Sequence, residues 1–352
     1  MKQSQEQRCL FILSGEHETL PQAELCAILE AEGFPYEVEG HQNQVLLLEV
    51  DPKGAKIATE RSGLVNHASV VFFESLADER QILERVKNCD FTGWIKPKGR
   101  FGVKITRVQR EPAVFDVDEL ASKVGSQIWQ ALKGQVAVDL TNPDVLFLGV
   151  INGNQFFFGP YLASRDRAGV YQRRSPLRPF FVPSAIHPKF ARVMVNLSRV
   201  KRGDLLLDPF CGTGGLLLEA ADIGCVSLGF DIDVSILTGC QQNLKHYKVP
   251  FNGALADARI IPLCPEGLNA IATDPPYGRS SSTKGSEVVE LIQTSLEVLA
   301  NHLKKGGYLC LALPEKYFGK EIIPTDSFSI VETHTMRIHR SLNRLIVVLQ
   351  RQ

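Results

Sequence analysis

The stretch that most limits how this chain can fold is Asp204–Gly215, with the sequence DLLLDPFCGTGG. A short apolar run ends in Asp208, and a glycine-rich turn then leads into the apolar residues 216–221. This order of strand, tight turn and helix opens an α/β nucleotide-binding unit. Because glycine has no Cβ, Gly212 and Gly214 let the backbone approach a ligand closely. The segment therefore predicts an α/β sheet with its ligand at the carboxyl ends of the strands.

The turn also limits which ligand fits. It has no third glycine at the dinucleotide spacing and no Lys-Ser/Thr pair of a phosphate loop, which disfavours NAD and ATP. S-adenosylmethionine fits better, since its amino-acid end needs close backbone and a nearby carboxylate. Two more strand-like runs end in acids, Asp231 and Asp257. Asp231 follows the turn at about twenty residues, the spacing that places an acid on ribose hydroxyls.

A fourth acid begins the segment Asp274-Pro275-Pro276-Tyr277, after the apolar run Asn269–Thr273. The two prolines hold the chain extended, which fixes the Asp274 carboxylate and the Pro275 carbonyl in the turn. Together these oxygens can accept two hydrogen bonds from an exocyclic amino group while Tyr277 stacks on the base. Taken alone, the segment could be a surface turn with a satisfied aspartate. Coming after three strand-end acids, it predicts a site that modifies an exocyclic amine.

The segments LLLDPFCGTGGLLLEA, GFDID and TDPPYGRSS together resemble class I S-adenosylmethionine-dependent methyltransferases that modify exocyclic amines. They are most similar to the archaeal tRNA guanosine-10 N2-methyltransferase family, and Arg178–Leu197 resembles that family too. The resemblance covers residues 178–352 well and the N-terminal half only in the order of its elements. It implies transfer of one or two methyl groups to N2 of guanosine 10 in tRNA.

The resemblance also implies the fold class and the site. The fold is α/β: a Rossmann-like, doubly wound sheet with an antiparallel C-terminal strand, preceded by α+β ferredoxin-like and THUMP domains. The implied catalytic residues are Asp274, Pro275, Pro276 and Tyr277. The implied cofactor-binding residues are Asp208, Pro209, Gly212, Gly214, Asp231, Ile232, Asp257 and Asp274.

Hydrophobic patterning predicts the domain boundaries. Residues 1–75 show the order β-α-β-β-α-β of a ferredoxin-like domain, and residues 76–160 an order compatible with a THUMP domain. We expect one strand over Ala68–Phe73 and the last THUMP strand to close at Gly159-Pro160. Residues 161–185 are expected to be a linker, and residues 186–352 the methyltransferase domain, with a long helix Ser286–Leu303 stopped by Gly306-Gly307.

Two groups of basic residues indicate where RNA binds. One lies in the THUMP segment, and the other is a set of linker arginines accompanied by a single acid, Asp166. Arginine suits bidentate contacts with phosphate. The alternative is that these basic residues form a solvent-exposed face that binds nothing. The RNA-binding residues that we expect are Lys98, Arg100, Lys104, Arg107, Arg165, Arg167, Arg173 and Arg174.

Composition limits the class of protein. The formal net charge is zero, so global charge does not indicate a nucleic-acid partner and local patches must do so. The eight cysteines include no Cys-x-x-Cys pair, which favours reduced thiols over disulfides or zinc. No apolar run reaches membrane length. We expect a cytoplasmic, monomeric enzyme without a metal, acting on tRNA.

Three alternatives stay open from the residues alone. An enzyme of the same fold could methylate adenine in DNA, guanine in ribosomal RNA or glutamine in protein. A non-catalytic RNA-binding protein could keep the fold, although the intact Asp-Pro-Pro-Tyr segment argues against it. An NAD-dependent oxidoreductase is disfavoured by the missing third glycine.

Overall fold

The computed structural model describes residues 6–108, 116–183, 185–276, 285–318, 322–339 and 342–352. By contacts between residues, the chain divides into two compact units. The first comprises Met1–Glu16, Phe34–Glu60 and Val65–Arg165. The second comprises His17–Gly33, Arg61–Leu64 and Asp166–Gln352. Each unit is described by itself below.

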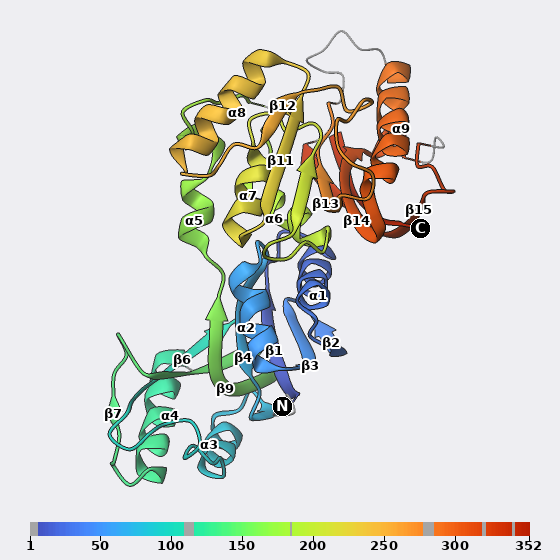
Figure 1. Ribbon diagram of the computed structural model, residues 1–352. Helices are drawn as coiled ribbons and strands as arrows, with labels where there is room; N and C mark the ends of the chain where they lie inside the picture. The colour runs from blue at the N-terminus through green and yellow to red at the C-terminus, as the bar shows by residue number, and fades with distance from the viewer. Residues whose placement is uncertain (1–5, 109–115, 184, 277–284, 319–321, 340–341) are drawn as a thin grey trace. The chain divides into compact units, whose positions relative to one another are not determined.

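In the described part of the first unit, nine strands form one sheet in the order β2-β3-β1-β4-β9-β8-β6-β7, with β5 paired to β9 (Figure 1). The order along the chain, β1-α1-β2-β3-α2-β4, confirms the ferredoxin-like prediction. The strands are β1 (Gln7–Leu13), β2 (Tyr36–Gln42), β3 (Val45–Val50), β4 (Val65–Val70), β5 (Phe73–Leu76), β6 (Arg100–Arg107), β7 (Ala137–Val138), β8 (Val145–Asn152) and β9 (Gln155–Ser164). The helices named with them are α1 (Leu20–Glu32), α2 (Pro52–Arg61), α3 (Glu79–Lys87) and α4 (Val117–Ala131).

Strand β9 does not close at Gly159-Pro160, so that prediction is wrong. It pairs with β5 through Phe158 and with β4 from Tyr161 onward. Pro160, which has no N–H to donate, lies where β9 passes from one neighbour to the other. A Cβ at residue 159 would lie 2.0 Å from the carbonyl oxygen of Val70, so glycine is required by this close approach. The strand predicted over Ala68–Phe73 is likewise divided, into β4 and β5.

The second unit contains a seven-stranded sheet in the order β12-β11-β10-β13-β14-β16-β15. Neighbouring strands from β12 to β14 run parallel, and β16 runs antiparallel to both β14 and β15. This arrangement confirms the predicted doubly wound sheet with an antiparallel C-terminal strand. The strands are β10 (Leu205–Asp208), β11 (Val226–Asp231), β12 (Gly253–Leu255), β13 (Leu268–Thr273), β14 (Leu303–Pro314), β15 (Phe328–His339) and β16 (Leu342–Arg351).

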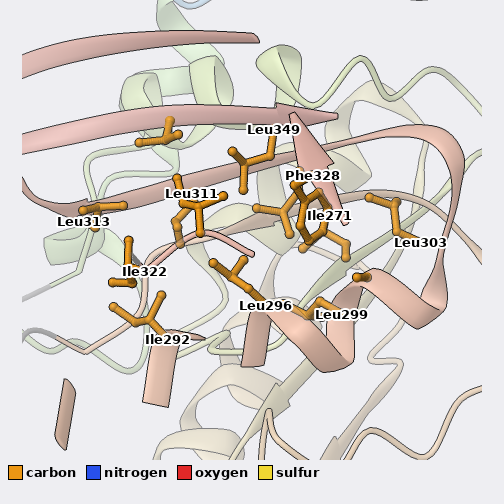
Figure 2. Close-up of a cluster of buried hydrophobic side chains, with 14 of the residues drawn as sticks. Ile271, Ile292, Leu296, Leu299, Leu303, Leu311, Leu313, Ile322, Phe328 and Leu349 are labelled. Atoms are coloured by element: carbon orange, nitrogen blue, oxygen red, sulfur yellow. The ribbon is translucent and has the colours of Figure 1, made fainter. Parts of the chain in front are cut away.

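Helices cover both faces of this sheet. On one face, α9 (Gly285–His302) packs Ile292, Leu296 and Leu299 against strand residues such as Ile271 and Leu311 (Figure 2). On the other face lie α6 (Pro188–Leu197) and α7 (Gly215–Ile223), while α8 (Val234–His246) packs beside α7. The short helices α5 (Arg167–Gln172), η1 (Ser175–Leu177) and η2 (Glu315–Tyr317) complete the unit. Helix α9 ends at His302, and Gly306-Gly307 lie inside β14 instead of stopping the helix, which corrects the prediction.

Helix α1 belongs to the second unit by its contacts. Its buried Glu24 accepts hydrogen bonds from the backbone nitrogens of Gly63 at 2.8 Å and Leu64 at 2.9 Å. The side-chain nitrogen of Asn196 on α6 donates to the same carboxylate at 2.7 Å. Asn196 in turn accepts from Nε of Arg61 at 2.8 Å. A buried polar network therefore ties α1 and residues 61–64 to α6.

Candidate active site

The four acids singled out by sequence stand at one edge of the second sheet. Asp208 is the last residue of β10 and Asp231 the last of β11, while Asp257 follows β12 and Asp274 follows β13. These strands are neighbours, so their carboxyl ends meet at the same edge. The chain runs from β10 outward to β11 and, in the other direction, to β13. The edge beside β10 and β13 is therefore the switch point where doubly wound folds bind ligands.

Asp208 differs from the other three acids because it is buried, with 1% of its surface exposed. Its Oδ1 accepts hydrogen bonds from the hydroxyl of Thr273 at 2.8 Å and from the backbone nitrogen of Phe210 at 3.1 Å. Burial raises the pKa of Asp208 to about 7, against the effect of these two hydrogen bonds. Its carboxyl group joins the ends of β10 and β13. Asp208, predicted to bind the cofactor, therefore lies beneath the turn, and Pro209 beside it is buried as well.

Asp231 lies against the glycine turn. Its Oδ2 accepts from the backbone nitrogen of Gly212 and its Oδ1 from that of Asp233, each at 3.0 Å. Gly212 has a φ of 51°, and a Cβ there would meet only the carbonyl oxygen of Phe210, at 4.0 Å. The turn is thus open above Gly212, whereas Gly214 is closed by packing: its Cβ would lie 2.6 Å from Leu244. Gly212 and Asp231 therefore form the part of the turn that a ligand can approach.

Two exposed aliphatic side chains flank the outer strand ends. Ile232 follows Asp231 and is 70% exposed, and Ile260 follows the loop of Asp257 and is 77% exposed. Asp257 is held by Arg259, whose Nη2 lies 2.6 Å from its Oδ2, and this hydrogen bond lowers the pKa of Asp257. Sequence reasoning missed Ile260. The signal that could have found it is a large apolar residue just after a strand-end acid.

Asp274 is paired with an arginine that the sequence did not suggest. Its Oδ2 lies 3.3 Å from Nη1 of Arg344, and both side chains are mostly buried. Arg344 is on β16, opposite Pro314 at the end of β14, so it reaches the same sheet edge from a distant part of the chain. Pro275 is buried and Pro276 is exposed. Tyr277 lies outside the described residues.

The predicted RNA-binding residues differ in their exposure and in the groups that their side chains contact. Lys98, Lys104 and Arg167 are exposed, and Arg107 and Arg165 are half-buried. Arg100 is shared between Asp139 at 3.2 Å and Asp144 at 3.0 Å. The guanidinium of Arg174 lies 3.7 Å from the ring centroid of Tyr171.

Arg173 is the exception among them. It is buried, and its guanidinium contacts Glu219 at 2.8 Å and Asp222 at 3.0 Å. Its charge is matched inside the fold by these two carboxylates.

The parallel sheet with its antiparallel strand, the open glycine turn and the Asp274-Pro275 turn define a class I methyltransferase. Residues 176–346 match the family described as "RMKL-like, methyltransferase domain", and residues 77–159 match the THUMP domain. The crystal structure of TrmN from Thermus thermophilus has the same fold, with a TM-score of 0.53 and 21% identity over 98% of this chain and 100% of that one.

Two archaeal proteins are similar over most of their length. The tRNA (guanine(10)-N2)-dimethyltransferase of Methanothermobacter thermautotrophicus is 36% identical over 345 residues, which cover 97% of this chain and 99% of that protein. The enzyme of the same name from Methanocaldococcus jannaschii is 34% identical over 330 residues, covering 87% and 91%. The chain belongs to the archaeal tRNA (guanine(10)-N2)-dimethyltransferase family, as its resemblance predicts.

Two negative findings concern only the part of the chain that the structure describes. There, no helix is both long enough and apolar enough to cross a membrane. In the same residues, no group of three or more His, Cys, Asp or Glu side chains is placed to hold a metal ion.

Proposed function

We propose that this protein transfers methyl groups from S-adenosylmethionine to the exocyclic N2 amine of guanosine 10 in tRNA, once or twice. The observation that supports it most is the position of Asp274 and Pro275. They follow β13 at the switch point, beside the strand that carries the open glycine turn. The methyl donor and the amine that receives the methyl group can meet there.

The residues of the turn fit this cofactor. Each oxygen of Asp231 accepts one backbone N–H and keeps lone pairs for ribose hydroxyls. Gly212 leaves room for the ligand against backbone, and Ile232 and Ile260 offer apolar faces to the adenine ring. The bound cofactor supplies a methyl group on a positively charged sulfur. Asp257, held in place by Arg259, lies at the end of β12 near this surface.

Asp274 and Pro275 act on the substrate amine. The N2 lone pair of guanine is delocalised into the ring, so the amine is a poor nucleophile. The Asp274 carboxylate and the Pro275 carbonyl accept its two N–H groups and turn the lone pair toward the methyl group. Such positioning can supply about 7–11 kcal/mol of barrier lowering. Asp274 then takes up the proton that leaves nitrogen.

The base must leave the tRNA helix to reach this turn, at an unstacking cost of a few kcal/mol. In this proposal Tyr277 stacks on the extruded guanine, and Pro276 keeps the turn extended. The THUMP domain and the linker after it bind tRNA. Lys98, Arg100, Lys104 and Arg107 of the THUMP domain and Arg165, Arg167 and Arg174 of the linker contact phosphate. The protein works as a monomer in the cytoplasm, where mature tRNA is used. We keep the boundaries 1–75, 76–160, 161–185 and 186–352 as the proposed domain division.

The test is nucleoside mass spectrometry of a tRNA transcript after incubation with the enzyme and S-adenosylmethionine. Wild type should produce N2-methylguanosine and then N2,N2-dimethylguanosine, and a transcript with adenosine at position 10 should stay unmodified. Asp274→Ala should lower turnover by at least about a thousandfold while binding of S-adenosylhomocysteine changes less than threefold. Exposed Asp326→Ala is the matched control and should behave as wild type.

Other outcomes would redirect the assignment. Equal methylation of both transcripts would remove position 10 as the target. Methylation of ribosomal RNA but not tRNA would favour the ribosomal alternative. Unimpaired turnover by Asp274→Ala would remove the catalytic assignment.

A further inference from the structure

Arg178 is a buried arginine whose terminal nitrogens have no partner. It is 5% exposed, and its Nε donates to the backbone carbonyl of Arg173 at 2.9 Å. Both terminal nitrogens, Nη1 and Nη2, are buried and find no hydrogen-bond acceptor in the described part of the chain. A buried charged group left unsatisfied costs several kcal/mol. A buried guanidinium of this kind needs a hydrogen-bond acceptor, preferably an anion.

The neighbouring buried arginines have carboxylate partners, which Arg178 lacks among the described residues. Arg173 and Arg192 are buried to a similar degree, and both are matched by Glu219 and Asp222. Glu219 and Asp222 already accept hydrogen bonds from these two arginines, and neither accepts one from Arg178. Burial lowers the pKa of the Arg178 guanidinium, although the nearby Tyr247 hydroxyl and Glu219 carboxylate act in the opposite direction.

The two unpartnered nitrogens lie at the N-terminus of α7. A Cβ built on Gly215 would lie 3.6 Å from Nη1 and 3.9 Å from Nη2 of Arg178. Helix α7 has nine residues, no side chain caps its N-terminus, and its first turn contains no acid. The N-terminus of a helix is itself positive because its first N–H groups have no intrahelical acceptor. A cation beside it is unfavourable unless an anion lies between them.

The segment that carries Arg178 is fixed to the glycine turn. Asn243 of α8 accepts from the backbone nitrogen of Phe180 at 2.9 Å. Its side-chain nitrogen donates to the carbonyl oxygens of Phe180 and of Thr213, each at 3.0 Å. One buried amide therefore joins the Arg178 segment to the residue between Gly212 and Gly214. The backbone two residues beyond Arg178 is therefore fixed to the turn, and the hydrogen bond from Nε to the carbonyl of Arg173 orients the guanidinium.

We propose that Arg178 and the N-terminus of α7 form a carboxylate subsite for the amino-acid end of the cofactor. This inference rests on the proposed function. The planar guanidinium presents two parallel N–H groups, which match the two oxygens of a carboxylate. Gly215, at the start of α7, follows Gly212 by three residues, and Gly212 donates its backbone N–H to Asp231 on the ribose side. A phosphate of RNA has similar oxyanion chemistry, but a nearly fully buried guanidinium suits the single carboxylate of a small ligand better.

The test compares ligands that differ only at the amino-acid end. Calorimetry on the full-length protein measures binding of S-adenosylhomocysteine, of its decarboxylated analogue and of 5′-methylthioadenosine. For wild type, S-adenosylhomocysteine should bind at least tenfold more tightly than the decarboxylated analogue. Arg178→Met should weaken S-adenosylhomocysteine by about tenfold to a hundredfold, the range for loss of a charge-assisted hydrogen-bond pair. It should change the affinity for the other two ligands less than threefold.

Exposed Arg202→Met is the matched control and should bind all three ligands as wild type does. If Arg178→Met does not fold, Arg178→Lys keeps the charge but loses the planar fork, and should reduce the carboxylate preference at least threefold.

An unchanged carboxylate preference in the Arg178 variant, or equal losses for all three ligands, would overturn the subsite. Weaker binding of tRNA with unchanged S-adenosylhomocysteine affinity would overturn it too and assign the site to phosphate. A wild-type protein that binds none of the three ligands would contradict the cofactor itself, which distinguishes failure of the proposed function from failure of the subsite.

Discussion

The contact between Asp274 and Arg344 joins two residues seventy positions apart in the chain, at the point where the substrate amine is proposed to bind. The Asp274 carboxylate is proposed to accept hydrogen bonds from the substrate amine and from Arg344. It must keep a fixed orientation to position the amine. The guanidinium of Arg344, 3.3 Å from Oδ2 of Asp274, supplies that orientation. We therefore treat Arg344 as a positioning residue.

Replacing Arg344 tests this role. Arg344→Gln should lower kcat by about tenfold to a hundredfold, because positioning is lost, with little change in the KM for S-adenosylmethionine. Arg344→Lys keeps the positive charge and should recover part of that loss. Steady-state kinetics with a tRNA transcript measures both variants. If Arg344→Lys is as impaired as Arg344→Gln and both melt at lower temperature than wild type, the residue supports only the fold.

Asp208 predicts a pH dependence of stability. Its pKa is raised from 3.8 to about 7 in the folded protein, so the folded state binds its proton more tightly than the unfolded state. The stabilisation is complete below pH 4 and is lost as the pH rises toward 7. The difference corresponds to an amount on the order of 4 kcal/mol, at about 1.4 kcal/mol for each pKa unit. Between pH 5 and 8, wild type should lose more unfolding free energy than Asp208→Asn.

Urea denaturation at several pH values measures this difference. Asparagine can still accept hydrogen bonds from Thr273 and Phe210 but cannot ionise. Exposed Asp326→Asn should follow the wild-type curve. Curves for wild type and Asp208→Asn that stay parallel between pH 5 and 8 would show that the Asp208 carboxyl does not titrate in this range.

Among the elements, α1 is held in place by a carboxylate. Glu24 is fully buried and serves four donors, from Ser62, Gly63, Leu64 and Asn196. Glu24→Ala would leave these donors without their acceptor, each at a cost of about 1–3 kcal/mol, partly relieved by water entering the gap. We expect a loss of at least about 3 kcal/mol in unfolding free energy.

Chemical denaturation compares this variant with Glu60→Ala. Glu60 is half-exposed and lies 3.8 Å from Lys56, so its loss should cost under about 1 kcal/mol. Equal, small effects for the two variants would show that the buried network contributes little.

The elements themselves follow closely from sequence, since apolar periodicity and capping act locally. The predicted order β-α-β-β-α-β is observed as β1-α1-β2-β3-α2-β4. The division of β4 from β5 and the length of β9 could not be predicted, because both depend on which strand lies alongside. No local pattern predicts that α1 packs on α6.

The same distinction holds in the site. Motif residues such as Asp231 and Gly212 are recognisable because their spacing within one βα unit is fixed. Arg344 and Arg178 acquire meaning only from residues far along the chain, and no local pattern marks them. The burial of Asp208 and Arg173 likewise results from tertiary packing. The types and spacing of the residues therefore predict the chemistry of the site. The partners of its charged groups become known only from the three-dimensional structure.

At the level of the whole chain, the hydrophobic core of the methyltransferase unit includes residues from the N-terminal part. Leu20, Ala27 and Leu64 share one buried cluster with residues of α6 and α7. Both leucines are fully buried, and burying a leucine side chain contributes about 1.5–3 kcal/mol. Together they supply about 3–6 kcal/mol, a large share of the 5–15 kcal/mol typical of a domain.

A chain truncated to residues 166–352 should therefore be much less stable than the corresponding unit in the full protein. It keeps the entire sheet and the four strand-end acids but exposes the face of α6 that α1 covers and leaves Asn196 without Glu24. We expect it to aggregate or to melt at least about 10 °C lower, followed by circular dichroism. A peptide of residues 17–33 should raise its melting temperature in a concentration-dependent manner, and a scrambled peptide should not. A truncated chain as stable as the full protein would mean that α1 packs on a surface that does not need it, and that the methyltransferase domain is complete without the N-terminal residues.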